Sequence, residues 1–124
     1  MGENREYISY LDEKGSINIS EEVVAIIAGS TALEIEGVAG LYSTPSRDIA
    51  ELLGRRNLAR GVKIHLEENT ISADIYIMAA LGFAVNEVGA SVQKAVSTAI
   101  ESTTGLKVTS INVHVCGIAF KKDK

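Results

Sequence analysis

The chain has 124 residues, of which 46% are hydrophobic and 23% are charged, and its formal net charge is −4 at pH 7. This length suits one domain with its own core, and the acidic balance argues against general affinity for nucleic acid or an anionic membrane surface. Cys116 is the only cysteine, so an intramolecular disulfide is excluded and a reducing compartment is favoured.

The N-terminal third of the chain predicts a leader, a strand and a helix. Residues 1–14 are polar and of mixed charge, so we expect a flexible leader without a signal peptide. Apolar and polar residues alternate over 16–20, which predicts a short strand. Ser20 is a suitable N-cap because its hydroxyl can accept a free backbone N–H, and the helix that follows runs to about Ile35. Residues 38–42 predict a further extended segment.

An irregular basic segment occupies residues 43–61. It contains three arginines, Arg55, Arg56 and Arg60, and we expect a surface loop. Guanidinium groups contact phosphate well, so nucleic-acid binding by this loop remains an alternative. We favour a solvated charged loop over nucleic-acid binding. Its expected function is to contact an acidic protein partner.

The clearest pattern in the chain is a β-hairpin, with strands over 62–67 and 71–78. Apolar and polar residues alternate in both strands, and a short polar turn joins them, so one face of the hairpin is expected to be buried. A stripe of small and branched apolar residues over 85–100 then predicts a second helix, which ends at Gly105.

A last strand is predicted over residues 106–120. Its apolar residues change parity near Thr109 and Ser110, where a bulge or bend would restore the inward face, and the parity shifts again at Gly117. The charged residues 121–124 form a C-terminal tail.

These elements predict one α+β domain over residues 15–120, in the order β-α-β-β-β-α-β. We expect a single two-layer fold, with a mixed β-sheet and both helices packed on the same face. No stretch is long and apolar enough to span a bilayer, so the sequence favours a cytoplasmic protein.

The opposite face of the sheet is the main candidate for a functional surface. Its predicted residues are Lys63, His65, Ser72, Asp74, Tyr76, Asn112, His114 and Cys116. Several of these are metal-ligand types, which raises the hypothesis of a metal site, but none has the spacing of a recognised metal motif. We favour a polar face that a protein partner covers. The predicted partner-binding residues are Arg55, Arg56, Arg60, Lys63, His65, Tyr76 and His114.

No motif in the chain proposes a reaction. There is no GxSxG nucleophile turn, no GxxxxGK[ST] phosphate loop and no GxGxxG dinucleotide motif. The prediction is therefore a non-enzymatic binding protein with no catalytic residue, no cofactor and no metal.

The order and spacing of several segments resemble the alkaline shock protein family. These are bacterial envelope stress response proteins and their relatives, mainly from Gram-positive organisms. The matching segments are Gly15–Ser20, Glu34–Val38, Leu53–Lys63 and Gly105–Val115. The likeness extends over about residues 15–118, which is nearly the whole chain.

The resemblance implies a cytoplasmic scaffold or regulatory protein in envelope stress response or envelope homeostasis. Members of the stress-response branch self-assemble and are held at the membrane by a separate anchor protein. Other branches are linked to fatty-acid synthesis and acetyl-CoA carboxylase. The resemblance leaves both branches open and supplies no catalytic residues.

Overall fold

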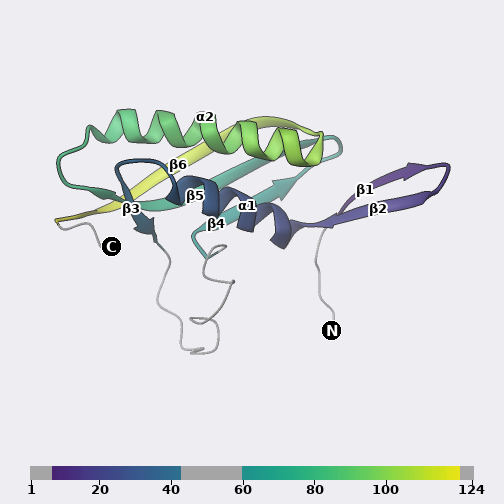
Figure 1. Cartoon of the computed structure of the whole chain (residues 1–124), viewed down its shortest axis with the longest axis horizontal. Coiled ribbons are helices and arrows are strands. Elements are labelled where there is room, and N and C mark those ends of the chain that lie inside the picture. The colour runs from purple at the N-terminus through teal and green to yellow at the C-terminus, as the bar shows by residue number, and fades with distance from the viewer. Residues whose placement is uncertain (1–6, 43–59, 121–124) are drawn as a thin grey trace, which may run out of the picture.

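The computed structural model describes residues 7–42 and 60–120 of the chain (Figure 1). The elements in chain order are β1 (Tyr7–Asp12), β2 (Gly15–Ser20), α1 (Glu21–Leu33), β3 (Val38–Leu41), β4 (Val62–Leu66), β5 (Thr70–Ala80), α2 (Val85–Thr104) and β6 (Lys107–Ala119).

Strand β5 is the centre of a mixed sheet. β4 pairs antiparallel with its first half and β3 pairs antiparallel with its second half, whereas β6 runs parallel to β5 along its whole length. β3 and β4 therefore share one edge of β5, and β6 occupies the other. Tyr76 lies at the join, because its N–H donates to Gly61 O and its carbonyl accepts from Tyr42 N, both at 2.8 Å.

The hydrophobic core lies between this sheet and the two helices, which cover the same face (Figure 1). Alternate residues of β5 point into this layer. The fully buried ones are Ile71, Ala73, Ile75, Ile77 and Ala79 on β5, Val24, Ala28 and Ala32 on α1, and Val92, Val96 and Ile100 on α2. The predicted α+β fold, with a mixed sheet and both helices on one face, is confirmed.

Helix α1 begins as its sequence predicts. The Ser20 hydroxyl accepts the Val23 N–H at 3.1 Å, which satisfies one of the free donors of the first turn. The helix ends at Leu33, two residues earlier than expected. The chain then turns through Gly37, whose φ is +99°, a conformation that side chains with a Cβ rarely adopt.

Residues 7–12 correct the expectation of a flexible leader over 1–14. They form β1, which pairs antiparallel with β2 from Tyr7 opposite Ser20 to Asp12 opposite Gly15. The Ser9 hydroxyl also donates to Asn18 Oδ1 at 2.6 Å across the pair. The resulting hairpin projects beyond the four-stranded sheet (Figure 1). The observed order therefore has one more strand than predicted.

The two parity shifts predicted in the last strand are confirmed, and each of them is a bulge. Ile71 pairs with Val108 but Ser72 pairs with Ser110, so Thr109 is an extra residue on β6. A second shift makes Cys116 the other extra residue. Each bulge changes the parity of β6, which keeps Ile111, Val113 and Val115 packed on the core. The predicted tail, residues 121–124, lies outside the described residues.

Candidate functional site

Four of the predicted partner-binding residues lie together on the sheet face opposite the helices. They are Lys63 and His65 on β4, Tyr76 on β5 and His114 on β6. They share a face because Lys63 pairs with Asp74 and His114 pairs with Tyr76, and these β5 residues alternate with the buried ones. We call this surface the open face.

The arginines of the predicted loop are placed differently. Arg60 is half-buried and directly precedes Gly61 at the edge of the sheet. Arg55 and Arg56 lie outside the described residues. The structure therefore describes the strand part of the predicted surface and, of the three predicted arginines, Arg60.

Asp74 is the centre of a polar cluster on the open face. Its Oδ2 lies 2.8 Å from His65 Nε2, and its Oδ1 lies 3.0 Å from His114 Nε2. Both histidines reach Asp74 diagonally, one from each neighbouring strand. A carboxylate can only accept hydrogen bonds, so each imidazole carries a proton on Nε2 and donates it to Asp74. The Nδ1 atom of each ring takes no part in this contact. We call Asp74, His65 and His114 the Asp74 cluster.

The hydrogen bonds keep Asp74 ionised. The bond from His114, followed by the bond from His65, lowers the pKa of the Asp74 carboxyl from 3.8 to about 2, and Asn112 adds a smaller effect in the same direction. Partial burial acts the other way, since it raises the pKa of a carboxyl. The hydrogen bonds outweigh burial because the Asp74 side chain keeps 22% of its surface exposed.

Tyr76 holds one side of the cluster in place. Its ring stacks on the His114 imidazole, with the ring centroids 4.4 Å apart and the planes 13° from parallel. His114 is therefore oriented both by a hydrogen bond and by an aromatic surface. Its side chain is still 43% exposed, and that of His65 is 50% exposed, so a partner could reach both.

The cluster does not gather its polar groups around one point. Each imidazole approaches a different Asp74 oxygen from a different strand, and within residues 7–42 and 60–120 no three His, Cys, Asp or Glu side chains are placed to hold a metal ion. The thiol of Cys116 is exposed and donates to the His114 carbonyl at 3.7 Å. The arrangement presents an oriented polar surface.

Sequence reasoning identified the residue types on the open face but did not name Asp74 as the group that joins them. The hairpin pattern alone places Asp74 beside Lys63 and diagonal to His65, so one contact could have been inferred from it. The contact with His114 depends on the parallel register of β6, which no local pattern shows.

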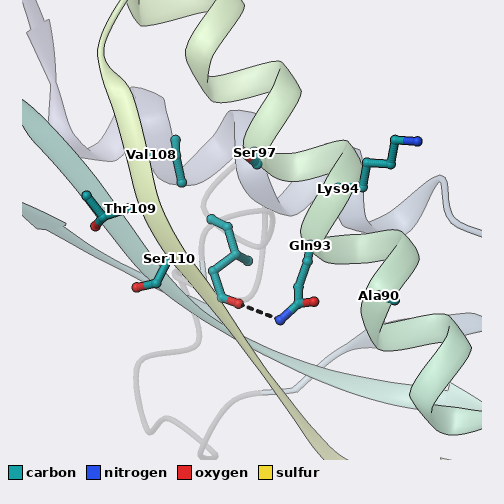
Figure 2. A pocket seen from close by; sticks show the side chains of 8 residues that line it. Ala90, Gln93, Lys94, Ser97, Val108, Thr109 and Ser110 are labelled. Carbon is teal, nitrogen blue, oxygen red and sulfur yellow. Dashed lines mark hydrogen bonds between the residues drawn. The ribbon is translucent and has the colours of Figure 1, made fainter.

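A groove lies on another part of the surface, between α2 and the outer edge of β6 (Figure 2). It measures about 340 Å³ and is lined by Ala90, Gln93, Lys94, Ser97, Val108, Thr109, Ser110 and Ile111. The Gln93 side chain crosses it and donates to the Ile111 carbonyl at 3.0 Å.

Neither helix in the described part of the chain has the length and apolarity needed to cross a bilayer.

Comparison with known proteins connects this chain to one family. A family model matches residues 10–120 and describes the alkaline shock protein 23 family, with a cell envelope-related function. The uncharacterized protein YloU of Bacillus subtilis is 37% identical over 106 residues, which cover 84% of this chain and 88% of YloU. The uncharacterized protein YqhY of the same organism is 34% identical over 106 residues, covering 86% of this chain and 78% of YqhY.

Among solved structures, a zinc form of a MamM CTD variant has a similar fold. Its TM-score is 0.50 at 16% sequence identity, and the match covers 83% of this chain and 90% of that one. At this identity the likeness concerns the fold alone.

Proposed function

This chain belongs to the alkaline shock protein family, and from that premise we propose that it is a non-enzymatic interaction module of the cell envelope. It binds a protein partner through the open face, in the cytoplasm, and acts there as a scaffold or regulator of envelope homeostasis. The same protein associates with itself.

The Asp74 cluster is the observation that carries this proposal. A solvated sheet face needs no fixed side chains, yet here one carboxylate holds two imidazoles and a tyrosine ring supports one of them. Side chains oriented in advance lose less conformational entropy when a partner binds, which favours recognition. Lys63 extends the polar surface, so the face suits a partner with polar and acidic groups.

The hydrogen bonds of the open face support a binding role better than a catalytic one. In the described part of the chain, no serine, threonine or cysteine side chain makes a hydrogen bond to either histidine ring, although such a bond marks an activated nucleophile. Two ring nitrogens and a carboxylate without a nucleophile support binding better than turnover.

A photo-crosslinking experiment tests the proposal in living cells. A photoreactive amino acid replaces Lys63 on the open face in one strain and Thr98, exposed on α2, in a control strain. We expect a discrete crosslinked partner from position 63 and not from position 98. The partner should be an envelope-associated protein, and the crosslink should fade in the double variant His65→Ala/His114→Ala.

Two results would contradict the proposal. One is equal crosslinking from both positions, which would mean that the open face has no special role. The other is a normal response to cell-wall stress in cells that carry only the double variant, provided that the variant is folded and present at the normal level.

A further inference from the structure

Strand β6 has a free edge. It is the longest strand, with 13 residues, and it pairs with β5 on one side only. No strand in the described part of the chain pairs with its other side. An unpaired edge exposes backbone donors and acceptors and readily binds another strand.

The hydrogen bonds of Tyr76 determine which β6 residues face that free edge. Tyr76 directs its N–H and its carbonyl toward β3 and β4, so its β6 partner, His114, must direct both of its own groups at β5. Neighbouring residues alternate, so Ile111, Val113 and Val115 direct theirs outward. The bond from Gln93 to the Ile111 carbonyl agrees with this assignment (Figure 2).

The free edge has few of the features that normally prevent strand pairing. From Val108 to Ala119 the chain contains no proline and no aspartate, glutamate, lysine or arginine. Bulges at Thr109 and Cys116 interrupt the edge at both ends, and Gln93 covers one carbonyl. Apart from the Ile111 carbonyl, the regular segment between the bulges is left open.

That segment is complementary to a second copy of itself. In an antiparallel pair centred on Val113, Val113 lies opposite its own counterpart, Ile111 lies opposite Val115, and Asn112 lies opposite His114. Apolar residues on the core side thus meet apolar residues, and polar residues on the open face meet polar ones. Ile111, Val113 and Val115 all direct both backbone groups outward, so every one of these pairs can exchange two hydrogen bonds.

A second copy fits this edge better than an extended peptide does. A bound peptide would present a new free edge of its own, whereas a second β6 uses the same edge in both copies and leaves neither β6 edge free. Small residues, Ala90 and Ser97, line the groove beside the edge, which leaves room for the approaching copy.

We propose that two copies of this chain pair through the β6 edges, antiparallel and centred on Val113, to form one continuous sheet. The proposal rests on the self-association included in the proposed function and names its surface. Gln93 leaves the Ile111 carbonyl when the pair forms. The two open faces then lie side by side on one surface of the dimer.

A matched pair of proline variants tests which edge is used. Val113→Pro removes an N–H that faces the free edge, so we expect a folded monomer by circular dichroism and sedimentation velocity. His114→Pro removes an N–H that bonds to β5, so it should unfold the domain. A wild type that stays monomeric at high concentration, or a folded Val113→Pro variant that still dimerises, would overturn the proposal.

A second pair of variants tests the register and does not depend on proline. Asn112→Lys/His114→Lys places like charges opposite each other in the dimer and should abolish it, whereas Asn112→Asp/His114→Lys places opposite charges there and should retain it. Equal dimerisation by both would refute the register. Gln93→Ala frees the Ile111 carbonyl and should strengthen the dimer.

Crosslinking separates this inference from the proposed function. If the Val113→Pro monomer still captures a partner from position 63, the open face works without the dimer. If a dimer forms but position 63 captures nothing, the proposed function fails and the edge pairing stands.

Discussion

Gly37 faces Val88 so closely that a Cβ on Gly37 would lie 2.6 Å from Val88 Cγ2. Gly37 belongs to the turn between α1 and β3, and Val88 is buried in the first turns of α2. Because Gly37 has no side chain, the two helices and the sheet can meet at this end of the core.

Gly37→Ala should therefore destabilise the fold more than its backbone angle alone explains. Gly82 provides a matched control, because its φ of +102° is close to the +99° of Gly37 and a Cβ there would meet nothing within 4 Å. Both variants suffer the backbone strain of a positive φ, about 1 kcal/mol or somewhat more. Urea unfolding should show an additional loss of about 1–3 kcal/mol for Gly37→Ala only. Equal losses would show that Val88 moves aside at no cost.

Asp74→Asn should weaken the fold in a pH-dependent way. The amide cannot accept from both imidazoles as the carboxylate does, so we expect a loss of about 1 kcal/mol near neutral pH. The pKa of Asp74 is lowered from 3.8 to about 2, so its stabilising effect is complete above about pH 4 and is lost as the pH falls through about 2. The difference in unfolding free energy between wild type and variant should shrink over that range.

The control for this experiment is Glu68→Gln, at an exposed position in the turn of the same hairpin. It removes one negative charge without touching the Asp74 cluster, and its unfolding curve should follow that of the wild type. A difference for Asp74→Asn that stays constant between pH 4 and pH 2 would contradict the assigned hydrogen bonds.

Ala84→Ser should stabilise the protein. Ala84 occupies the N-cap of α2 with extended backbone angles, φ −72° and ψ 118°, but it has no side chain that can cap the helix. Serine there, with Glu87 three residues later, creates a capping box, in which each side chain accepts a backbone N–H from the other residue. The expected gain is about 1 kcal/mol, measurable as a higher midpoint of thermal unfolding. Ala84→Val, which cannot cap, should give no gain.

Ile75→Val should test how tightly the core is packed. Ile75 is fully buried at the centre of β5, and the loss of one methylene there should cost about 0.5–1.5 kcal/mol. Ile17→Val makes the same chemical change at a side chain that is 58% exposed, and it should cost little. Similar losses for both would mean that the β1–β2 hairpin buries Ile17 in solution.

The elements with strong periodicity were predictable from the sequence. Alternation over 62–78 defined the β4–β5 hairpin, and the apolar stripe of α2 defined the second helix, because each pattern reports one buried face. The parity changes near Thr109 and Gly117 also correspond to real bulges. A short stretch of sequence is enough to reveal these features, because each of them follows from burying one face of a helix or strand against the core.

The features that were missed depend on pairing between distant segments. β1 pairs with β2 along its whole length, and this pairing is not visible in the pattern of residues 7–12 alone. The contact of Asp74 with His114 likewise requires the parallel register of β5 and β6. A slip of one residue would turn His114 toward the helices, and the bulge at Thr109 shifts that register before His114 is reached.

The join at Tyr76 has a consequence for how the chain tolerates change. Tyr42 and Gly61 bond to the same β5 residue, and a Cβ on Gly61 would lie 2.7 Å from the Tyr42 carbonyl oxygen. The two ends of the intervening segment are therefore held together by the sheet itself. Closing a loop between fixed neighbours costs only about 0.6 kcal/mol more for each doubling of its length. The described domain should therefore tolerate changes of length or sequence between Tyr42 and Gly61.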